Sequence, residues 1–176
     1  MRSFEAEKFS QILSLLKDKS PQSIGNLSNS LLIEPNKIIS VVSSMSKLGI
    51  PVQVYGQSIS LKFKSDFLDS RIIEEQLSDM CRQKKVYLRT FELIDSTNDF
   101  LISEKTDASK IAVVLSEIQT QGRGRRGKFW QSPFGSNIYM SVKWNFDPRE
   151  VSPAGLSLVI GLAVSKALWA NGLRDV

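Results

Sequence analysis

The spacing of apolar residues changes along this chain, and this change constrains the fold more than any other feature. In the first part, Phe9, Ile12, Leu13 and Leu16 recur three and four positions apart, which predicts an amphipathic helix. From Val86 onward, short apolar runs typical of strands follow one another between helical segments. We therefore expect an α+β chain with a helical first part and a mixed α/β second part.

Three helices and a hairpin are expected in residues 1–63. We expect the second helix to begin at Ser20–Pro21 and the third at Glu34–Pro35, because a capping residue followed by proline is typical of a helix start. Alternating apolar residues on either side of Gly56–Gln57 predict the hairpin. This order is that of a winged helix-turn-helix, and it favours a DNA-binding domain.

The third helix is the element that would contact DNA. Only Lys37 and Lys47 are basic between Glu34 and Gly49, so the electrostatic attraction to phosphates would be small. A small helical domain that binds a protein or nothing therefore stays open. The residues that we expect to contact DNA are Asn36, Lys37, Ser40, Ser44 and Lys47.

Residues 64–85 are expected to be a polar connector around one helix, with an inert Cys81 near its end. Residues 86–176 are expected to form the second domain. Its expected elements are strands over 86–94, 111–118 and 138–144, helices that include Leu101 and 154–170, and the first step of a further strand at 173–176.

Composition excludes several classes of site. The chain has 176 residues, a net charge of +5, one cysteine and no histidine. It cannot by itself build a Ser-His-Asp triad, a histidine metal site, an internal disulfide or a thiolate zinc cluster. The sequence has no secretory signal and no apolar run near the ~20 residues that a membrane span needs, so we expect a cytoplasmic protein with no protein-bound metal and no membrane partner.

Two polar segments of the second part are candidates for chemistry. Gly122–Lys128 holds four basic residues and three glycines in seven positions, which suits anion binding, while nucleic-acid binding or a solvated loop stays open. Asp95–Asn98 either caps a helix or offers polar groups to a small ligand. Trp130 either belongs to the core or stacks on a flat ligand.

Four motifs occur in order along the second part: Asp95–Asn98, Glu117–Gly127, Trp130–Asn137 and Gly155–Gly161. Together they resemble the first half of the catalytic domain of the biotin protein ligases, an α/β domain like that of class II aminoacyl-tRNA synthetases. Residues 1–63 and the connector resemble, more loosely, the bifunctional form in which the ligase is also the biotin operon repressor.

The resemblance implies roles for individual residues. The residues that would bind biotin are Ser96, Thr97, Gln119, Gly122, Arg123 and Arg125. Of these, Arg123 and Arg125 would also act in catalysis, in a loop that orders over biotin and the adenylate. Trp130 would lie against the adenine.

The resemblance also implies a reaction and partners. Biotin and ATP, the latter with Mg²⁺, would give biotinyl-AMP and pyrophosphate. A lysine of the biotin carboxyl carrier protein of acetyl-CoA carboxylase would then accept the biotin. Operator DNA and a second copy of the chain are further implied partners. The alternatives are a ligand-sensing DNA-binding regulator without ligase activity and a lipoate or octanoate ligase.

The resemblance places one expected group outside the sequence. The family's Lys-Trp-Pro-Asn-Asp motif would come a few residues after Val176, where this sequence stops. Its lysine would normally act on the carboxylate and the phosphate, so we expect these residues alone to have little ligase activity. We also expect poor stability, because a partial sheet exposes apolar faces and an unpaired edge.

Overall fold

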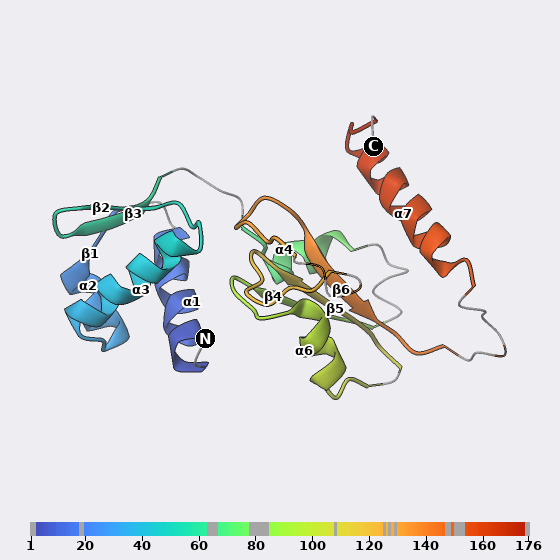
Figure 1. Cartoon of the computed structure of the whole chain (residues 1–176), viewed down its shortest axis with the longest axis horizontal. Helices are drawn as coiled ribbons and strands as arrows, with labels where there is room; N and C mark the ends of the chain where they lie inside the picture. The colour runs from blue at the N-terminus through green and yellow to red at the C-terminus, as the bar shows by residue number, and fades with distance from the viewer. Residues whose placement is uncertain are drawn as a thin grey trace. The chain divides into compact units, whose positions relative to one another are not determined.

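The structure is a computed structural model with two compact units, Met1–Trp144 and Asn145–Val176. It is a mixed α+β chain (Figure 1). Cys81, Arg125 and Gly127 lie outside the residues that it describes. Those residues are 3–17, 20–62, 67–77, 85–107, 109–124, 126, 128, 130–146, 149 and 154–174, with side chains described from residue 7 onward.

Three helices and a small sheet make up the first part of the chain (Figure 1). The helices are α1 (Ser3–Lys17), α2 (Ile24–Leu31) and α3 (Pro35–Lys47). The strands are β1 (Gln22–Ser23), β2 (Val52–Tyr55) and β3 (Ser58–Leu61), paired in the antiparallel order β1-β3-β2. The apolar spacing predicted the first helix correctly, since Phe9, Ile12, Leu13 and Leu16 are all buried.

The predicted start of the second helix is wrong. Ser20 and Pro21 precede the short strand β1, which pairs Gln22 with Ile59 of β3. The helix begins three residues later than predicted, at Ile24, where the Ser23 hydroxyl accepts a hydrogen bond of 3.0 Å from the Asn26 backbone N–H. Pairing with a strand far along the chain therefore outweighs the local helix-start signal at Ser20–Pro21.

The predicted third helix and hairpin are confirmed. Glu34 is the N-cap of α3 and Pro35 its first residue. Gly49, just beyond the helix, has a φ of 81°, a conformation that glycine adopts at little cost. Gly56 turns the hairpin with a φ of 56°. Phe63, the last residue expected in the hairpin, lies outside the described residues.

A second sheet has the order β4-β5-β6 (Figure 1). It consists of β4 (Val86–Phe91), β5 (Ile111–Ser116) and β6 (Tyr139–Lys143), with β4 parallel and β6 antiparallel to β5. Helix α6 (Thr97–Ser103) packs against β5 and β6, and its Leu101 is buried with Ala112 and Val114. The predicted strands are confirmed with shorter bounds than expected, and the helix that includes Leu101 and a connector helix, α4 (Ser70–Gln76), are confirmed too.

Charged groups at the carboxyl end of this sheet contact α1 and the connector. Lys17 Nζ lies 2.9 Å from Glu92 Oε1, and the Glu117 carboxylate accepts a hydrogen bond of 2.6 Å from the Leu68 N–H. Burial raises the pKa of Glu117, and the negative charge of Glu92 adds to this effect. Burial also acts to raise the pKa of Glu92, but Lys17, through its hydrogen bond and its charge, and the hydrogen bonds from a backbone N–H and from Ser10 together outweigh it, so that pKa is lowered.

The unit Asn145–Val176 contains the apolar helix α7 (Leu156–Ala170). It begins after Gly155, whose φ is 84°, and Gly172 follows it with a φ of 86°. The predicted helix is therefore confirmed with a start two residues later than expected. Leu173 and Arg174 belong to no strand, which corrects the expected strand at these two positions. Among the helices that the structure describes, none is long and apolar enough to cross a bilayer.

Candidate functional site

The parallel pairing of β4 and β5 brings two polar segments together. The carboxyl ends of parallel strands lie at the same edge of a sheet, where ligands commonly bind. Beyond the strand ends, Ile94 still pairs with Gln119, and the Thr120 N–H donates to the Ile94 carbonyl at 3.0 Å. The Gln121 N–H donates to the Asp95 carbonyl at 2.8 Å. The Asp95–Asn98 turn and the segment that leads into the glycine-arginine loop are therefore neighbours.

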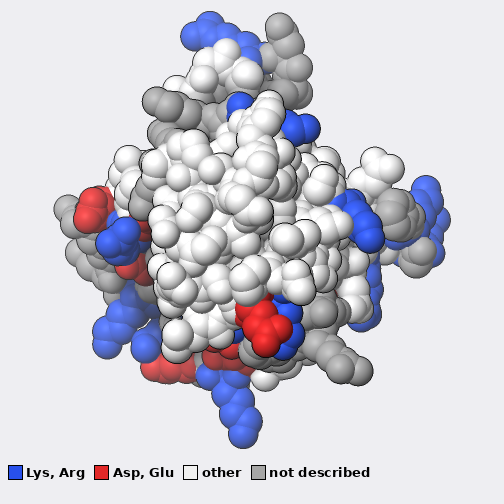
Figure 2. All heavy atoms as spheres, turned by 90° about the vertical axis from the view of Figure 1, so that its left-hand side faces the viewer, with Lys and Arg blue, Asp and Glu red and all other residues white. Residues whose placement is uncertain are grey.

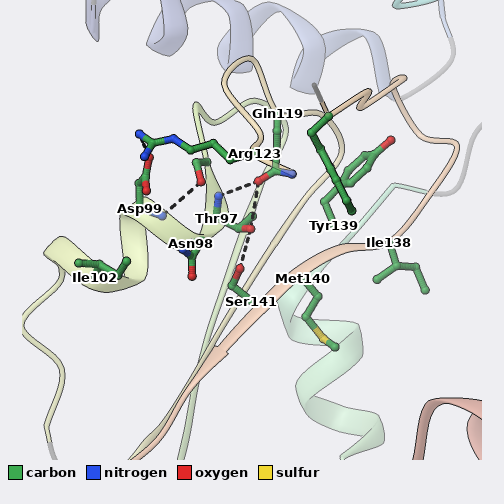
Figure 3. A pocket seen from close by; sticks show the side chains of 12 residues that line it. Thr97, Asn98, Asp99, Ile102, Gln119, Arg123, Ile138, Tyr139, Met140 and Ser141 are labelled. Atoms are coloured by element: carbon green, nitrogen blue, oxygen red, sulfur yellow. Dashed lines mark hydrogen bonds and ion pairs between the residues drawn. The ribbon is translucent and has the colours of Figure 1, made fainter. Parts of the chain in front are cut away.

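Buried Thr97 is the centre of a hydrogen-bond network with the half-buried Gln119 and Ser141 (Figure 3). Gln119 Oε1 accepts from the Thr97 N–H at 2.9 Å and from its hydroxyl at 3.1 Å. Ser141 Oγ lies 2.8 Å from Thr97 Oγ1. The oxygen of Gln119 faces Thr97, so its NH₂ group is the end that can donate to a ligand.

Ser96 has a structural role as well as a place in the site. It is the N-cap of α6, and its hydroxyl accepts a hydrogen bond of 3.2 Å from the Asp99 N–H. The helix-cap interpretation of this turn is therefore confirmed. Ser96 is 5% exposed and Thr97 3%, which is low for polar side chains and shows that packing fixes their positions.

The loop after Gln119 approaches the site closely because it carries glycine. A Cβ on Gly122 would lie 2.6 Å from Trp130 Cδ1 and 3.2 Å from Gln119 Nε2. Gly124 is similarly crowded, and its N–H donates to the Lys128 carbonyl at 3.0 Å. Glycine at position 122 thus lets the loop backbone pass against the Trp130 ring.

These elements enclose a cavity of about 550 Å³ (Figure 3). Its polar lining comes mainly from α6, Gln119 and Ser141, and its apolar lining from Trp130 and the start of β6. At its rim, Arg123 Nη2 lies 2.8 Å from Asp99 Oδ2. The lining residues are Ser96, Thr97, Asn98, Asp99, Ile102, Gln119, Arg123, Trp130, Ile138, Tyr139, Met140 and Ser141.

The arrangement suits a small ligand with three kinds of group. The Thr97 network offers buried hydroxyl and amide groups that can bind a polar head. Ile138, Met140 and Trp130 offer apolar surface for a hydrocarbon portion or a flat ring. Arg123, whose side chain is 72% exposed, can reach an anionic group at the open side of the cavity.

The structure brings together most of the residues that the sequence singled out. Ser96, Thr97, Gln119, Arg123 and Trp130 line the cavity, and Gly122 lies against Trp130 and Gln119. Arg125 lies outside the described residues. No group of acidic or cysteine side chains placed to hold a metal ion is present in the described part of the chain.

Sequence reasoning missed Asp99, Tyr139 and Ser141. The period of two along β6 could have found two of them, because Tyr139, Ser141 and Lys143 share one face of the strand and are polar or partly polar. Asp99 carried no such signal, since its side chain matters only through its contact with Arg123.

The five residues expected to contact DNA are all exposed on or at the start of α3. Figure 2 shows the face of the molecule that lies on the left in Figure 1, and most of the atoms on that face belong to uncharged residues. Only Lys37 and Lys47 of α3 are basic and both are exposed, so the weakly basic character expected from the sequence holds for the exposed side chains of this helix. The five residues are Asn36, Lys37, Ser40, Ser44 and Lys47.

Several known proteins are similar in sequence to this chain. Residues 90–175 match the Biotin/lipoate A/B protein ligase family. The Bifunctional ligase/repressor BirA of Salmonella typhimurium is 32% identical over 166 residues, which cover 94% of this chain and 50% of that protein. The Bifunctional ligase/repressor BirA of Escherichia coli K12 is 39% identical over 84 residues, which cover 48% of this chain and 26% of that protein.

A solved structure, the biotin protein ligase from Aquifex aeolicus in complex with biotin and ATP, is 34% identical with a TM-score of 0.39. The match covers 47% of this chain and 34% of that one. The chain thus spans at most half the length of the relatives that it matches. Residues 90–175 of the chain are therefore similar to the biotin/lipoate A/B protein ligase family.

Proposed function

We propose that this chain acts in the ATP-dependent attachment of biotin to a carrier protein. In the first step, a carboxylate oxygen of biotin attacks the α-phosphorus of ATP. The new O–P bond forms as the bond to the β-phosphate bridge breaks, which gives biotinyl-AMP and pyrophosphate. In the second step, the amine of a carrier lysine attacks the acyl carbon, AMP leaves, and the amine loses a proton.

One observation carries this proposal: the part-buried Thr97–Gln119–Ser141 network and an exposed Arg123 line the same cavity, within the residues that match the family. The ureido group of biotin has both donors and acceptors, which matches the hydroxyl and amide groups of this network. Ser96 holds the α6 end in place beside it. The relatives named ligase/repressor support the same assignment.

The charged part of the reaction belongs to the glycine-arginine loop. We assign Arg123, with Arg125, to the biotin carboxylate and the α-phosphate, because guanidinium groups neutralise charge as it moves onto oxygen. Gly122 lets the backbone approach, and Trp130 offers a ring for adenine. Mg²⁺ enters as part of the substrate, bound to ATP. Closing the loop would keep water from the mixed anhydride.

The test is binding of biotin to the Thr97→Val variant, measured by calorimetry. Valine keeps the shape and the backbone N–H that donates to Gln119, but its side chain cannot bond to Gln119 or Ser141. We expect biotin affinity to fall about tenfold to a hundredfold, since an unpaired buried polar group costs about 1–3 kcal/mol. Thr90→Val, on β4 and away from the cavity, is the matched control. Equal affinity in both variants, or no binding of biotin to the wild type, contradicts the proposal.

A lipoate or octanoate ligase is the first alternative, because the family that residues 90–175 match includes both branches. A calorimetric competition between biotin and lipoate separates the two. The polar network favours biotin, since the ring of lipoate has no amide to bond with Thr97 and Gln119. Tighter binding of lipoate would reassign the substrate.

DNA binding by residues 1–63 is a second function that we propose, as a winged helix-turn-helix with α3 as the recognition helix. The exposed polar side chains of α3 and the β2–β3 hairpin that follows it in the chain favour this assignment. If residues 1–63 bind DNA, the alternative function for the whole chain is a ligand-sensing regulator without ligase activity. Lys37→Ala and Lys47→Ala should each lower the slope of log affinity against log salt by about 1, measured by fluorescence anisotropy. Unchanged slopes would remove α3 from the DNA interface.

The remaining assignments follow from this function. We propose residues 1–63, 64–85 and 86–176 as the DNA-binding part, the connector and the catalytic part. The biotin carboxyl carrier protein of acetyl-CoA carboxylase is the proposed acceptor, and a homodimer the proposed DNA-binding form. The cytoplasm is the proposed location, because ATP and the carrier are found there.

A further inference from the structure

Asp99 is the one charged residue of the cavity that the proposed reaction does not use. Its Oδ2 lies 2.8 Å from Arg123 Nη2, and both side chains line the cavity (Figure 3). The Asp99 N–H donates to Ser96 Oγ at 3.2 Å, which holds its backbone within the first turn of α6. The carboxylate is therefore presented to Arg123 from a fixed position rather than from a loose surface segment.

The charge balance of the cavity depends on this pair. Among the described residues that line the cavity, Arg123 and Asp99 are the only ones that carry a charge near pH 7. The lining is therefore neutral while both are charged, and it would carry a net +1 without Asp99. An anionic ligand that enters the cavity therefore finds the Arg123 guanidinium already paired with the Asp99 carboxylate.

We infer that Asp99 is a specificity-determining residue that occupies Arg123 until an anionic ligand displaces it. This inference rests on the proposed function, in which Arg123 binds the biotin carboxylate. A carboxylate ligand must compete with Asp99 for the same guanidinium, whereas a neutral ligand leaves the pair intact. Asp99 thus lowers the affinity for acids and reduces the advantage of the acid over its neutral analogue.

The size of the effect follows from exposure. The side chain of Arg123 is 72% exposed and that of Asp99 42%, so solvent screens their attraction. Exposed pairs contribute about 0.2–1 kcal/mol, which corresponds to a change in affinity of about 1.4- to 5-fold. The competition with Asp99 should therefore modulate ligand binding rather than abolish it.

The test compares biotin with biotinamide, its neutral analogue, in the wild type and in Asp99→Asn, by calorimetry at low salt. We expect Asp99→Asn to bind biotin about 1.4- to 5-fold more tightly and biotinamide with unchanged affinity. The gain should shrink as salt rises, since the Debye length falls to about 10 Å at 0.1 M. Arg123→Gln should remove the gain when combined with Asp99→Asn, because no guanidinium is left to release.

Glu74→Gln is the matched control, because it removes the same charge from α4, outside the cavity lining. A gain in both variants would mean that overall charge, not the pair, sets the affinity. Weaker binding of biotin to Asp99→Asn would mean that Asp99 positions Arg123 rather than competing for it. Either result overturns the inference and leaves the biotin site standing, whereas a wild type that binds neither compound refutes the proposed function itself.

Discussion

The helices of residues 3–62 and the carboxyl end of the β4-β5-β6 sheet bury different kinds of side chain. In the helical part, the fully buried side chains include Phe9, Leu13, Leu27, Ile38 and Met45, and all are apolar. At the sheet end, the buried residues include polar and charged ones. They are Ser96, Thr97, Ser116 and Glu117, and within the described part of the chain these are the only buried polar residues.

This difference separates packing from function. Apolar burial drives folding, and a well-packed apolar core needs no specific partner for each atom. Burying a hydroxyl or carboxylate costs free energy unless the group is hydrogen-bonded. A buried polar side chain is therefore a candidate for a role other than packing. The polar residues of this chain gather at one sheet end, and two of them line the cavity. Variants in the helical core should therefore lose mainly stability, and variants at the sheet end should lose mainly ligand binding.

Leu13→Ala should give the largest loss of stability. Leu13 is 0% exposed in the helical core, and truncation of a buried leucine costs about 2–5 kcal/mol. Urea unfolding of the whole chain measures the loss. Leu32→Ala is the matched control, because Leu32 is 93% exposed and its truncation should change stability by about 0.5 kcal/mol or less. Equal losses in the two variants would contradict the packing described for α1.

How much of this molecule could be predicted from sequence also differs between the two regions. The faces of α1 and α3 were predictable because a helix with one buried face repeats its apolar residues locally. The start of α2 was not, because the pairing of Gln22 with Ile59 joins segments far apart in the chain. The helices with an apolar face were therefore found, whereas the wrong start of α2 came from a long-range contact that a local signal does not report.

At the site, the sequence identified residues but not their contacts. Ser96 and Thr97 stood out as a polar turn, and their roles came from the resemblance to a family. That Thr97 bonds to Ser141, 44 positions away, depends on the register of β6 against β5. Asp99 could not be found from spacing, because its interaction with Arg123 needs the folded loop.

Gly122→Ala should disturb the site more than the helical core. The added methyl would lie 2.6 Å from Trp130 Cδ1, so the ring or the loop must move. We expect a loss of about 1–3 kcal/mol in stability and at least about tenfold weaker binding of biotin, measured by unfolding and calorimetry. Gly25→Ala is the control, since its nearest neighbour would be 3.9 Å away. Unchanged binding in Gly122→Ala would mean that the loop does not need this close approach.

Lys143→Met should lower the free energy of unfolding by about 1.5–3 kcal/mol, without the loss of biotin binding expected for Gly122→Ala. Lys143 Nζ donates to the carbonyls of Leu101 at 2.9 Å and Glu104 at 3.0 Å, which ties β6 to the end of α6. Methionine keeps the length of the side chain but removes the donor. Thermal unfolding measures the loss, with the exposed Lys105→Met as control. A stability equal to that of the control would show that these bonds contribute nothing to the attachment of α6.

Glu117 and Glu92 give the smallest expected effect and the sharpest test, because their pKa shifts have opposite signs. Burial raises the pKa of Glu117, so the unfolded chain loses this proton at a lower pH than the folded chain does. The free energy of unfolding therefore falls as pH rises from the ordinary carboxyl pKa through the raised pKa. The pKa of Glu92 is lowered in the fold, so its ionised carboxylate stabilises the folded chain at pH values above the ordinary carboxyl pKa. This stabilisation is lost as pH falls through the lowered pKa.

Glu117→Gln should therefore flatten the decline in stability above the ordinary carboxyl pKa, and Glu92→Gln should flatten the decline below it. Glutamine keeps an oxygen that can accept from the Leu68 N–H, so the first variant removes the charge without removing that bond. Urea unfolding at a series of pH values measures both profiles. If both variants change the profile on the same side of the ordinary carboxyl pKa, the pKa values of Glu117 and Glu92 are not shifted in opposite directions, which contradicts the prediction.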